Sequence, residues 1–166
     1  MKPEIYILVV EDEPEVLDSI VRDITEFEDY FTVEMADTAE EAESLIDEIT
    51  GRDGKIGLIL CDHVLPGKNG VELLVEMQKN EKTISTRKVL ITGQAGLDET
   101  VKAVNEADLK HYIAKPWEKK DLVDITRKLL TDFVLEEVKD PLPFMQILDS
   151  ERIAESLRTG RKITDQ

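Results

Sequence analysis

Four apolar stretches of the chain each end in a polar side chain whose type suits chemistry on a charged ligand. These side chains are the acidic pair Glu11 and Asp12, then Asp62, Thr92 and Lys115. In an open parallel sheet, the carboxyl ends of the strands face one common crevice. Strands with these ends would therefore deliver carboxylates, a hydroxyl and an ammonium group to one place.

Three carboxylates at neighbouring strand ends repel one another unless a cation joins them. Mg²⁺ suits such a site, because it takes a few protein oxygens and completes its shell with water and phosphate oxygens. The ion would also neutralise charge on a phosphoryl donor. Asp62 would then act as a carboxylate nucleophile that forms an aspartyl-phosphate. Lys115 could pair with the phosphoryl oxygens, and Thr92 could donate its hydroxyl to one of them.

The elements that must position these residues alternate between strand and helix. The predicted strands are residues 5–10, 31–35, 56–61, 87–92 and 111–114. The predicted helices are residues 14–24, 39–49, 71–77, 98–105 and 122–134. Continuous apolar runs are typical of strands buried on both faces, whereas apolar residues spaced three and four apart indicate a helix face.

Five strand-then-helix units with short connections predict an α/β fold, with one parallel sheet covered by helices on both faces. Right-handed crossovers leave few topologies for such a sheet. The flavodoxin-like strand order 2-1-3-4-5 is expected, and it places the first strand beside the third. Glu11, Asp12 and Asp62 would then share one crevice.

Single residues mark the ends of several predicted helices. Pro14 suits the first turn of the first helix, and Thr38 is the expected N-cap of the second. Gly51 is the expected stop of the second helix, and Asp98 can cap the fourth.

The composition limits the class of protein. The 166 residues are enough for about one domain with some surplus. The net charge of −16 argues against nucleic acid and anionic membrane as direct partners, since phosphate binding needs a basic face. The single cysteine, Cys61, excludes an internal disulfide and is expected to be a small core residue. The apolar run 5–10 is too short to span a bilayer, so the cytoplasm is the expected location.

A set of motifs in this order resembles the receiver domain of two-component response regulators, the CheY-like superfamily. The motifs are Glu11-Asp12, the run from Leu58 to Gly70 around Asp62, Thr92, and Lys115-Pro116. The resemblance covers roughly residues 4–131. It implies a phosphorelay protein that accepts a phosphoryl group on Asp62 from a sensor histidine kinase or a phosphotransfer protein, and then switches a surface for a downstream protein target. It implies no enzymatic activity beyond its own phosphorylation and dephosphorylation.

The resemblance also assigns a metal site by position. Asp12 would be a direct Mg²⁺ ligand, and Glu11 would act mainly through water. Asp62 would be both the phosphoacceptor and a metal ligand, and the backbone carbonyl of Val64 would be the third protein ligand. Glu11 departs from the aspartate of many family members, and its longer arm alters the metal geometry.

The same resemblance implies a switch. Thr92 and Lys115 would sense the phosphoryl group, and the Lys115–Pro116 peptide bond is usually cis in this family. Tyr112 matches the aromatic switch position, where the ring turns inward when the Thr92 hydroxyl moves toward phosphate. His63 is expected to line a loop. Trp117 could pack on the fifth helix or lie on a partner surface, and the sequence does not decide between these.

The last residues exceed the expected length of a receiver, which predicts a receiver domain over 1–131 and a separate segment over 132–166. Pro141 and Pro143 should break the fifth helix, and Asp149 or Ser150 can cap a short helix that stops at Gly160. The segment is too short and too acidic for a DNA-binding output domain. It is either a helical extension that packs on the receiver or mediates dimerisation, or a linker to an absent output domain. A homodimer could also form through the face of the fourth and fifth helices.

Other functions fit the residues less well. A haloacid dehalogenase-type phosphatase needs a second acid two residues after its nucleophile, where this chain has Val64. A flavodoxin-like flavin carrier needs a phosphate-binding loop after the first strand, where this chain has acidic residues. A receiver fragment of a larger regulator with an enzymatic or kinase output, and a degenerate receiver that binds partners constitutively, stay open as alternatives.

Overall fold

The computed structural model describes residues 4–93 and 97–160, with only the backbone for 97–100. The strands are β1 (Ile5–Val10), β2 (Thr32–Ala36), β3 (Lys55–Asp62), β4 (Arg87–Thr92) and β5 (His111–Ala114). The α-helices are α1 (Pro14–Asp23), α2 (Ala39–Gly51), α3 (Gly70–Gln78), α4 (Leu97–Glu106), α5 (Lys119–Glu137) and α6 (Ser150–Thr159). Two short 3-10 helices, η1 (Thr25–Phe27) and η2 (Leu142–Phe144), complete the described elements.

The strands form one parallel sheet in the order β2-β1-β3-β4-β5, which confirms the predicted topology. Alternate strand residues point to two apolar cores. One core lies between the sheet and α1 and α5, and the other lies between the sheet and α2, α3 and α4. The central strands β1 and β3 are buried on both faces, which explains their unbroken apolar sequences.

The helix ends follow the predicted signals with small shifts. Pro14 begins α1, and the Thr38 side chain accepts a hydrogen bond from the backbone N–H of Glu41 at 3.0 Å as the N-cap of α2. Gly51 is the last residue of α2 rather than the residue after it. The prediction that Asp98 caps α4 is wrong, because the helix begins at Leu97. An acid is favourable throughout the first helical turn, so its presence does not fix which residue is the cap.

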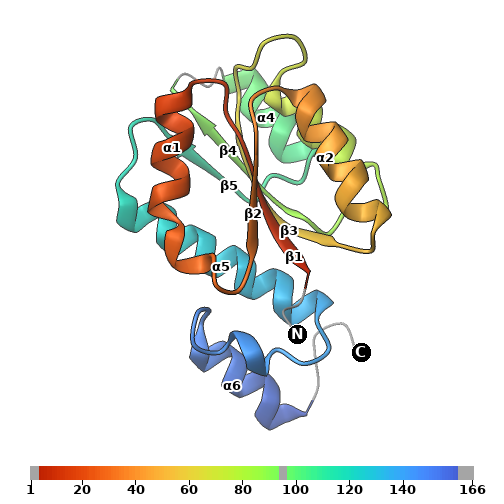
Figure 1. Cartoon of the computed structure of the whole chain (residues 1–166), viewed down its shortest axis with the longest axis vertical. Coiled ribbons are helices and arrows are strands. Elements are labelled where there is room, and N and C mark those ends of the chain that lie inside the picture. The colour runs from red at the N-terminus through yellow and green to blue at the C-terminus, as the bar shows by residue number, and fades with distance from the viewer. Residues whose placement is uncertain (1–3, 94–96, 161–166) are drawn as a thin grey trace.

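The C-terminal segment folds back onto the α/β core. Helix α5 runs unbroken to Glu137, across the predicted 131/132 boundary, and η2 and α6 then lie beneath α1 and α5 (Figure 1). The Phe144 ring stacks on Phe31 with centroids 5.3 Å apart, and Ile153 of α6 is fully buried. Residues 138–160 therefore pack on the α/β core, and the choice between an extension and a linker stays a prediction. The domain boundary itself stays a prediction.

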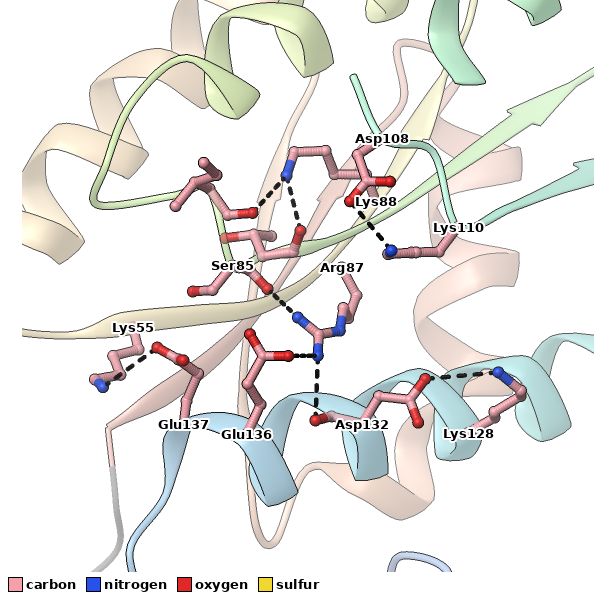
Figure 2. A network of polar contacts seen from close by, with 12 residues as sticks. Lys55, Ser85, Arg87, Lys88, Asp108, Lys110, Lys128, Asp132, Glu136 and Glu137 are labelled. Atoms are coloured by element: carbon pink, nitrogen blue, oxygen red, sulfur yellow. Dashed lines mark hydrogen bonds and ion pairs between the residues drawn. The ribbon is translucent and has the colours of Figure 1, made fainter. Parts of the chain in front are cut away.

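Polar contacts join this segment to the sheet (Figure 2). The Arg87 guanidinium, at the start of β4, donates to the Glu136 carboxylate at 2.8 Å and to the Asp132 carbonyl at 3.2 Å. The Asp132 carboxylate in turn pairs with Arg152 of α6 at 2.8 Å. These contacts thus link the start of β4 to the C-terminal end of α5, and that end to α6.

The next residue of β4, Lys88, is buried, and its ammonium group forms no ion pair with a carboxylate of residues 4–93 or 97–160. Its ammonium donates to the Thr86 carbonyl at 2.8 Å and to the Gln78 side-chain oxygen at 2.9 Å. Burial lowers the pKa of Lys88 to about 8, although the charge of Asp108 acts in the opposite direction. The ammonium group thus holds the loop between α3 and β4 at an energetic cost.

None of the helices in residues 4–93 and 97–160 has the length and apolar composition needed to cross a membrane.

Replacing Lys88 by methionine tests the cost of burying this ammonium group. Because the folded-state pKa is about 8 and the ordinary value is 10.5, the unfolded chain binds more protons between these values. The stability of the wild-type protein relative to Lys88→Met should therefore rise by about 1–2 kcal/mol from about pH 7.5 to about pH 9.5. Urea unfolding at several pH values measures this difference. A difference that is constant with pH would contradict the prediction, and the exposed Lys82→Met variant is the control.

Candidate functional site

The ends of β1 and β3 bring three carboxylates together. The register pairs Val10 with Cys61, so the residues that follow, Glu11 and Asp62, lie side by side. Carboxylate oxygens of Glu11, Asp12 and Asp62 all lie within 4.8 Å of one another. Glu11 is fully buried and Asp62 is 6 % exposed, whereas Asp12 is exposed. The predicted acidic cluster is therefore present, with one member open to solvent.

Lys115 lies against the two buried members of this cluster. Its backbone N–H donates to the Thr92 carbonyl at 2.9 Å, which holds it at the ends of β4 and β5. Its Nζ lies 2.8 Å from Oε1 of Glu11 and 3.2 Å from Oδ1 of Asp62. The Lys115–Pro116 peptide bond is cis, as expected.

Burial and charge act in opposite directions on these groups. Burial raises the pKa of Glu11, and the Lys115 ammonium and the N–H of Glu13 only partly offset this. Burial acts to lower the pKa of Lys115, but the Glu11 and Asp62 carboxylates outweigh it, so the pKa is raised. The lysine thus stays charged, and the three carboxylates exceed it in charge. A hard divalent cation with oxygen ligands fits this donor set.

A glycine sets the tight turn behind Asp62, and the sequence pattern alone did not single it out. A Cβ atom on Gly70 would lie 1.9 Å from the Asp62 carbonyl oxygen, so any larger residue would displace the strand end. The Gly70 N–H donates to the His63 carbonyl at 2.9 Å, and Asn69 caps α3 by accepting from the N–H of Glu72. In the sequence, Gly70 was included only as the last residue of the family motif around Asp62.

The remaining predicted residues lie around the crevice. Thr92 ends β4 and is 2 % exposed. Tyr112 of β5 is 47 % exposed, so its ring is outside the core in this structure. The Val64 side chain is 68 % exposed, and the role of its carbonyl stays a prediction.

The structure also places Trp117 and Cys61, for which the sequence suggested structural roles. Trp117 is partly buried, and its Nε1 donates to Asp23 of α1 at 2.9 Å, a contact that neither alternative for this residue included. Cys61 is fully buried, and burial raises the pKa of its thiol, which fits a core residue.

Comparisons with known proteins agree on one family. The family model described as "Response regulator receiver domain" matches residues 7–127. The hydrogenase transcriptional regulatory protein HoxA of Cupriavidus necator is 33% identical over 122 residues, which are 74% of this chain and 23% of HoxA. The phosphate regulon transcriptional regulatory protein PhoB of Pseudomonas aeruginosa is 30% identical over 117 residues, 70% of this chain and 48% of PhoB. The chain thus spans about a quarter to a half of the length of these relatives.

Solved structures share the fold over their whole length. A CheY-like response regulator receiver domain protein from Methanospirillum hungatei has a TM-score of 0.67 and 32% identity, and the match covers 80% of this chain and 97% of that one. The signal receiver domain of an HD domain-containing protein from Pseudomonas fluorescens has a TM-score of 0.69 and 25% identity, with 80% and 98% covered.

Replacing Lys115 by methionine removes the ammonium group that lies between two buried carboxylates. The free energy of unfolding at about pH 7.5 should fall by about 2–4 kcal/mol, because Glu11 and Asp62 become uncompensated buried charges. Acid should relieve the loss. A carboxyl with a raised folded-state pKa is protonated as the pH falls through that pKa, and the penalty on its charged form then disappears.

Denaturant unfolding without divalent ions, at a series of pH values from about 7.5 downward, measures both effects. Lys120 provides the control, since it forms an exposed pair with Asp124 on α5. Lys120→Met should change the free energy of unfolding by less than about 0.5 kcal/mol. A loss for Lys115→Met that does not shrink at any lower pH of the series would rule out buried carboxylates as its cause.

Proposed function

This chain belongs to the response regulator receiver domain family, and from that premise we propose that it accepts a phosphoryl group on Asp62 in a two-component phosphorelay. The observation that carries the proposal is the grouping of Glu11, Asp12 and Asp62 within 4.8 Å beside the Lys115 ammonium. The donor would be a sensor histidine kinase or a phosphotransfer protein. The chain would act on no separate substrate as an enzyme.

Mg²⁺ fits the acidic group as the proposed cofactor. Asp12 and Asp62 would hold it directly, with Glu11 acting through water and Val64 contributing its backbone carbonyl. When bound, the ion would neutralise charge between the acceptor carboxylate and the incoming phosphoryl group.

The side chains have separate roles in the proposed transfer. An Asp62 carboxylate oxygen forms a bond to phosphorus while the bond from phosphorus to the donor nitrogen breaks, and the electron pair leaves with that nitrogen. The Lys115 ammonium pairs with a phosphoryl oxygen in place of its present contact with the Asp62 carboxylate. The Thr92 hydroxyl donates to another phosphoryl oxygen.

Phosphorylation would shift the protein between two states. As the Thr92 hydroxyl moves toward phosphate, the exposed Tyr112 ring would turn inward and change the surface around β5. A downstream protein target would recognise that surface. Phosphorylation could instead act through a homodimer, formed by the α4–α5 face or by the C-terminal segment.

A second candidate is that these residues are the receiver portion of a larger regulator. It is favoured by the length of the relatives, since HoxA and PhoB are transcriptional regulatory proteins of which the match covers 23% and 48%. The prediction that this chain contacts no nucleic acid applies to its own acidic residues and stays untested for any larger protein.

Asp62→Asn tests the acceptor. The intact wild-type protein, incubated with acetyl phosphate and Mg²⁺, should gain the mass of one phosphoryl group, and the gain should be lost with a chelator or with Asp62→Asn. Asp47→Asn, an exposed aspartate on α2, is the matched control and should leave the gain unchanged. No gain in the folded wild-type protein would favour the degenerate receiver instead.

Tyr112 gives a direct signal for the switch, because the chain has only three tyrosines. In protein labelled with fluorotyrosine, the Tyr112 resonance should shift and lose solvent accessibility on phosphorylation, while that of the buried Tyr6 should not. Thr92→Val should keep the phosphoryl group but abolish the Tyr112 shift, because it removes the hydroxyl. A full shift in Thr92→Val would exclude Thr92 as the link.

A further inference from the structure

The net charge of the chain is concentrated in one segment. Residues 11–50 contain sixteen of the 37 acidic residues and one of the 21 lysines and arginines, Arg22. This segment therefore carries fifteen of the sixteen net negative charges, and the other 126 residues are almost neutral.

The segment forms one edge of the molecule. It comprises α1, η1, β2 and α2, and β2 is an edge strand of the sheet with α1 and α2 on either side (Figure 1). We call this surface the acidic edge. It borders the proposed phosphorylation site, because the Glu11 N–H donates to the Ala36 carbonyl at 3.0 Å, where β1 and β2 end.

Exposed acids line the rim of the crevice on this edge. Glu15 lies in the first turn of α1, Asp37 follows β2, and Glu40 lies in the first turn of α2. The Glu40 carboxylate is beside the loop that follows Asp62, since a Cβ atom on Gly67 would lie 3.6 Å from it. An anion approaching Asp62 from this side therefore meets negative charge.

The lysines nearest the crevice are already paired with carboxylates. Lys115 is held by Glu11 and Asp62. Lys68, on the loop after Asp62, is held at 2.7 Å by Glu43 and at 2.6 Å by Glu76. Arg22 lies in the last turn of α1, at the end away from the crevice.

We propose that the acidic edge selects among phosphoryl donors by charge and disfavours small dianionic donors at Asp62. The inference rests on the proposed function of Asp62. A field of one sign around a cleft changes the local concentration of a charged reactant, and the effect grows with the charge of that reactant and falls with ionic strength. A small dianion is therefore repelled about twice as strongly, in free energy, as a monoanion of similar size.

The test compares two small donors that differ in charge. Acetyl phosphate is a dianion at neutral pH, whereas phosphoramidate has one net negative charge. Initial rates of Asp62 labelling are followed by intact mass from about 0.05 M to about 0.5 M ionic strength, with Mg²⁺ kept saturating at each salt concentration. The acetyl phosphate rate should rise about threefold or more, and its logarithm should rise about twice as steeply as that of phosphoramidate.

Two triple variants with the same change in charge locate the effect. Glu15→Gln/Asp37→Asn/Glu40→Gln neutralises the rim, and it should raise the low-salt acetyl phosphate rate about threefold and flatten its salt dependence. Glu28→Gln/Asp29→Asn/Asp47→Asn neutralises exposed acids farther from the crevice along the same edge, and it should change the rate by less than about 1.5-fold.

The outcomes separate this inference from the proposed function. Equal salt dependence for the two donors, or equal effects of the two triple variants, would overturn donor selection by the rim. If neither donor labels Asp62, even at high ionic strength, the proposed function is overturned and this inference with it. Labelling that follows the charge of the donor and the position of the neutralised acids supports both.

Discussion

The structure depends on one electrostatic constraint, which is that two carboxylates are buried side by side at the ends of β1 and β3. Glu11 and Asp62 are almost fully removed from water, and the Lys115 ammonium lies within 3.2 Å of both. Such a group of charges is stable only if its members are fixed by a rigid frame, because a misplaced cation leaves an uncompensated buried charge. The parallel sheet supplies that frame. Its central strands are buried on both faces, so their ends have little freedom to move apart.

Most of this frame could be predicted because the sequence pattern is local and repetitive. Four of the five predicted strands are apolar runs that lead to a polar site residue, and the alternation with helices leaves few topologies. The site residues followed from their positions at strand ends, since a parallel sheet brings those ends together. The metal ligands and the switch residue came from the family resemblance, and Glu11, Asp12 and Asp62 do lie together.

Contacts between distant segments could not be predicted in the same way. Lys88 is the second residue of β4, and its charge gives no local sign of the carbonyl groups that surround it. The pairing of Trp117 with Asp23 joins residues 94 positions apart. The packing of Phe144 on Phe31 likewise depends on a chain reversal after α5, and the apolar residues of that segment showed only that a partner was needed. The cap of α4 was misplaced because acids are favourable at several positions in a first turn.

Helix α5 has a mechanical consequence that its boundaries alone do not suggest. Its 19 residues form a single rod of about 28 Å, without a proline or glycine to bend it. One end begins four residues after Lys115. Near the other end, Arg87 of β4 donates to the Glu136 carboxylate and to the Asp132 carbonyl (Figure 2), and the Asp132 carboxylate pairs with Arg152 of α6. A straight helix without such a bend tilts as one unit. A displacement of its first turn would therefore also shift its C-terminal end, together with α6, which pairs with that end through Asp132 and Arg152.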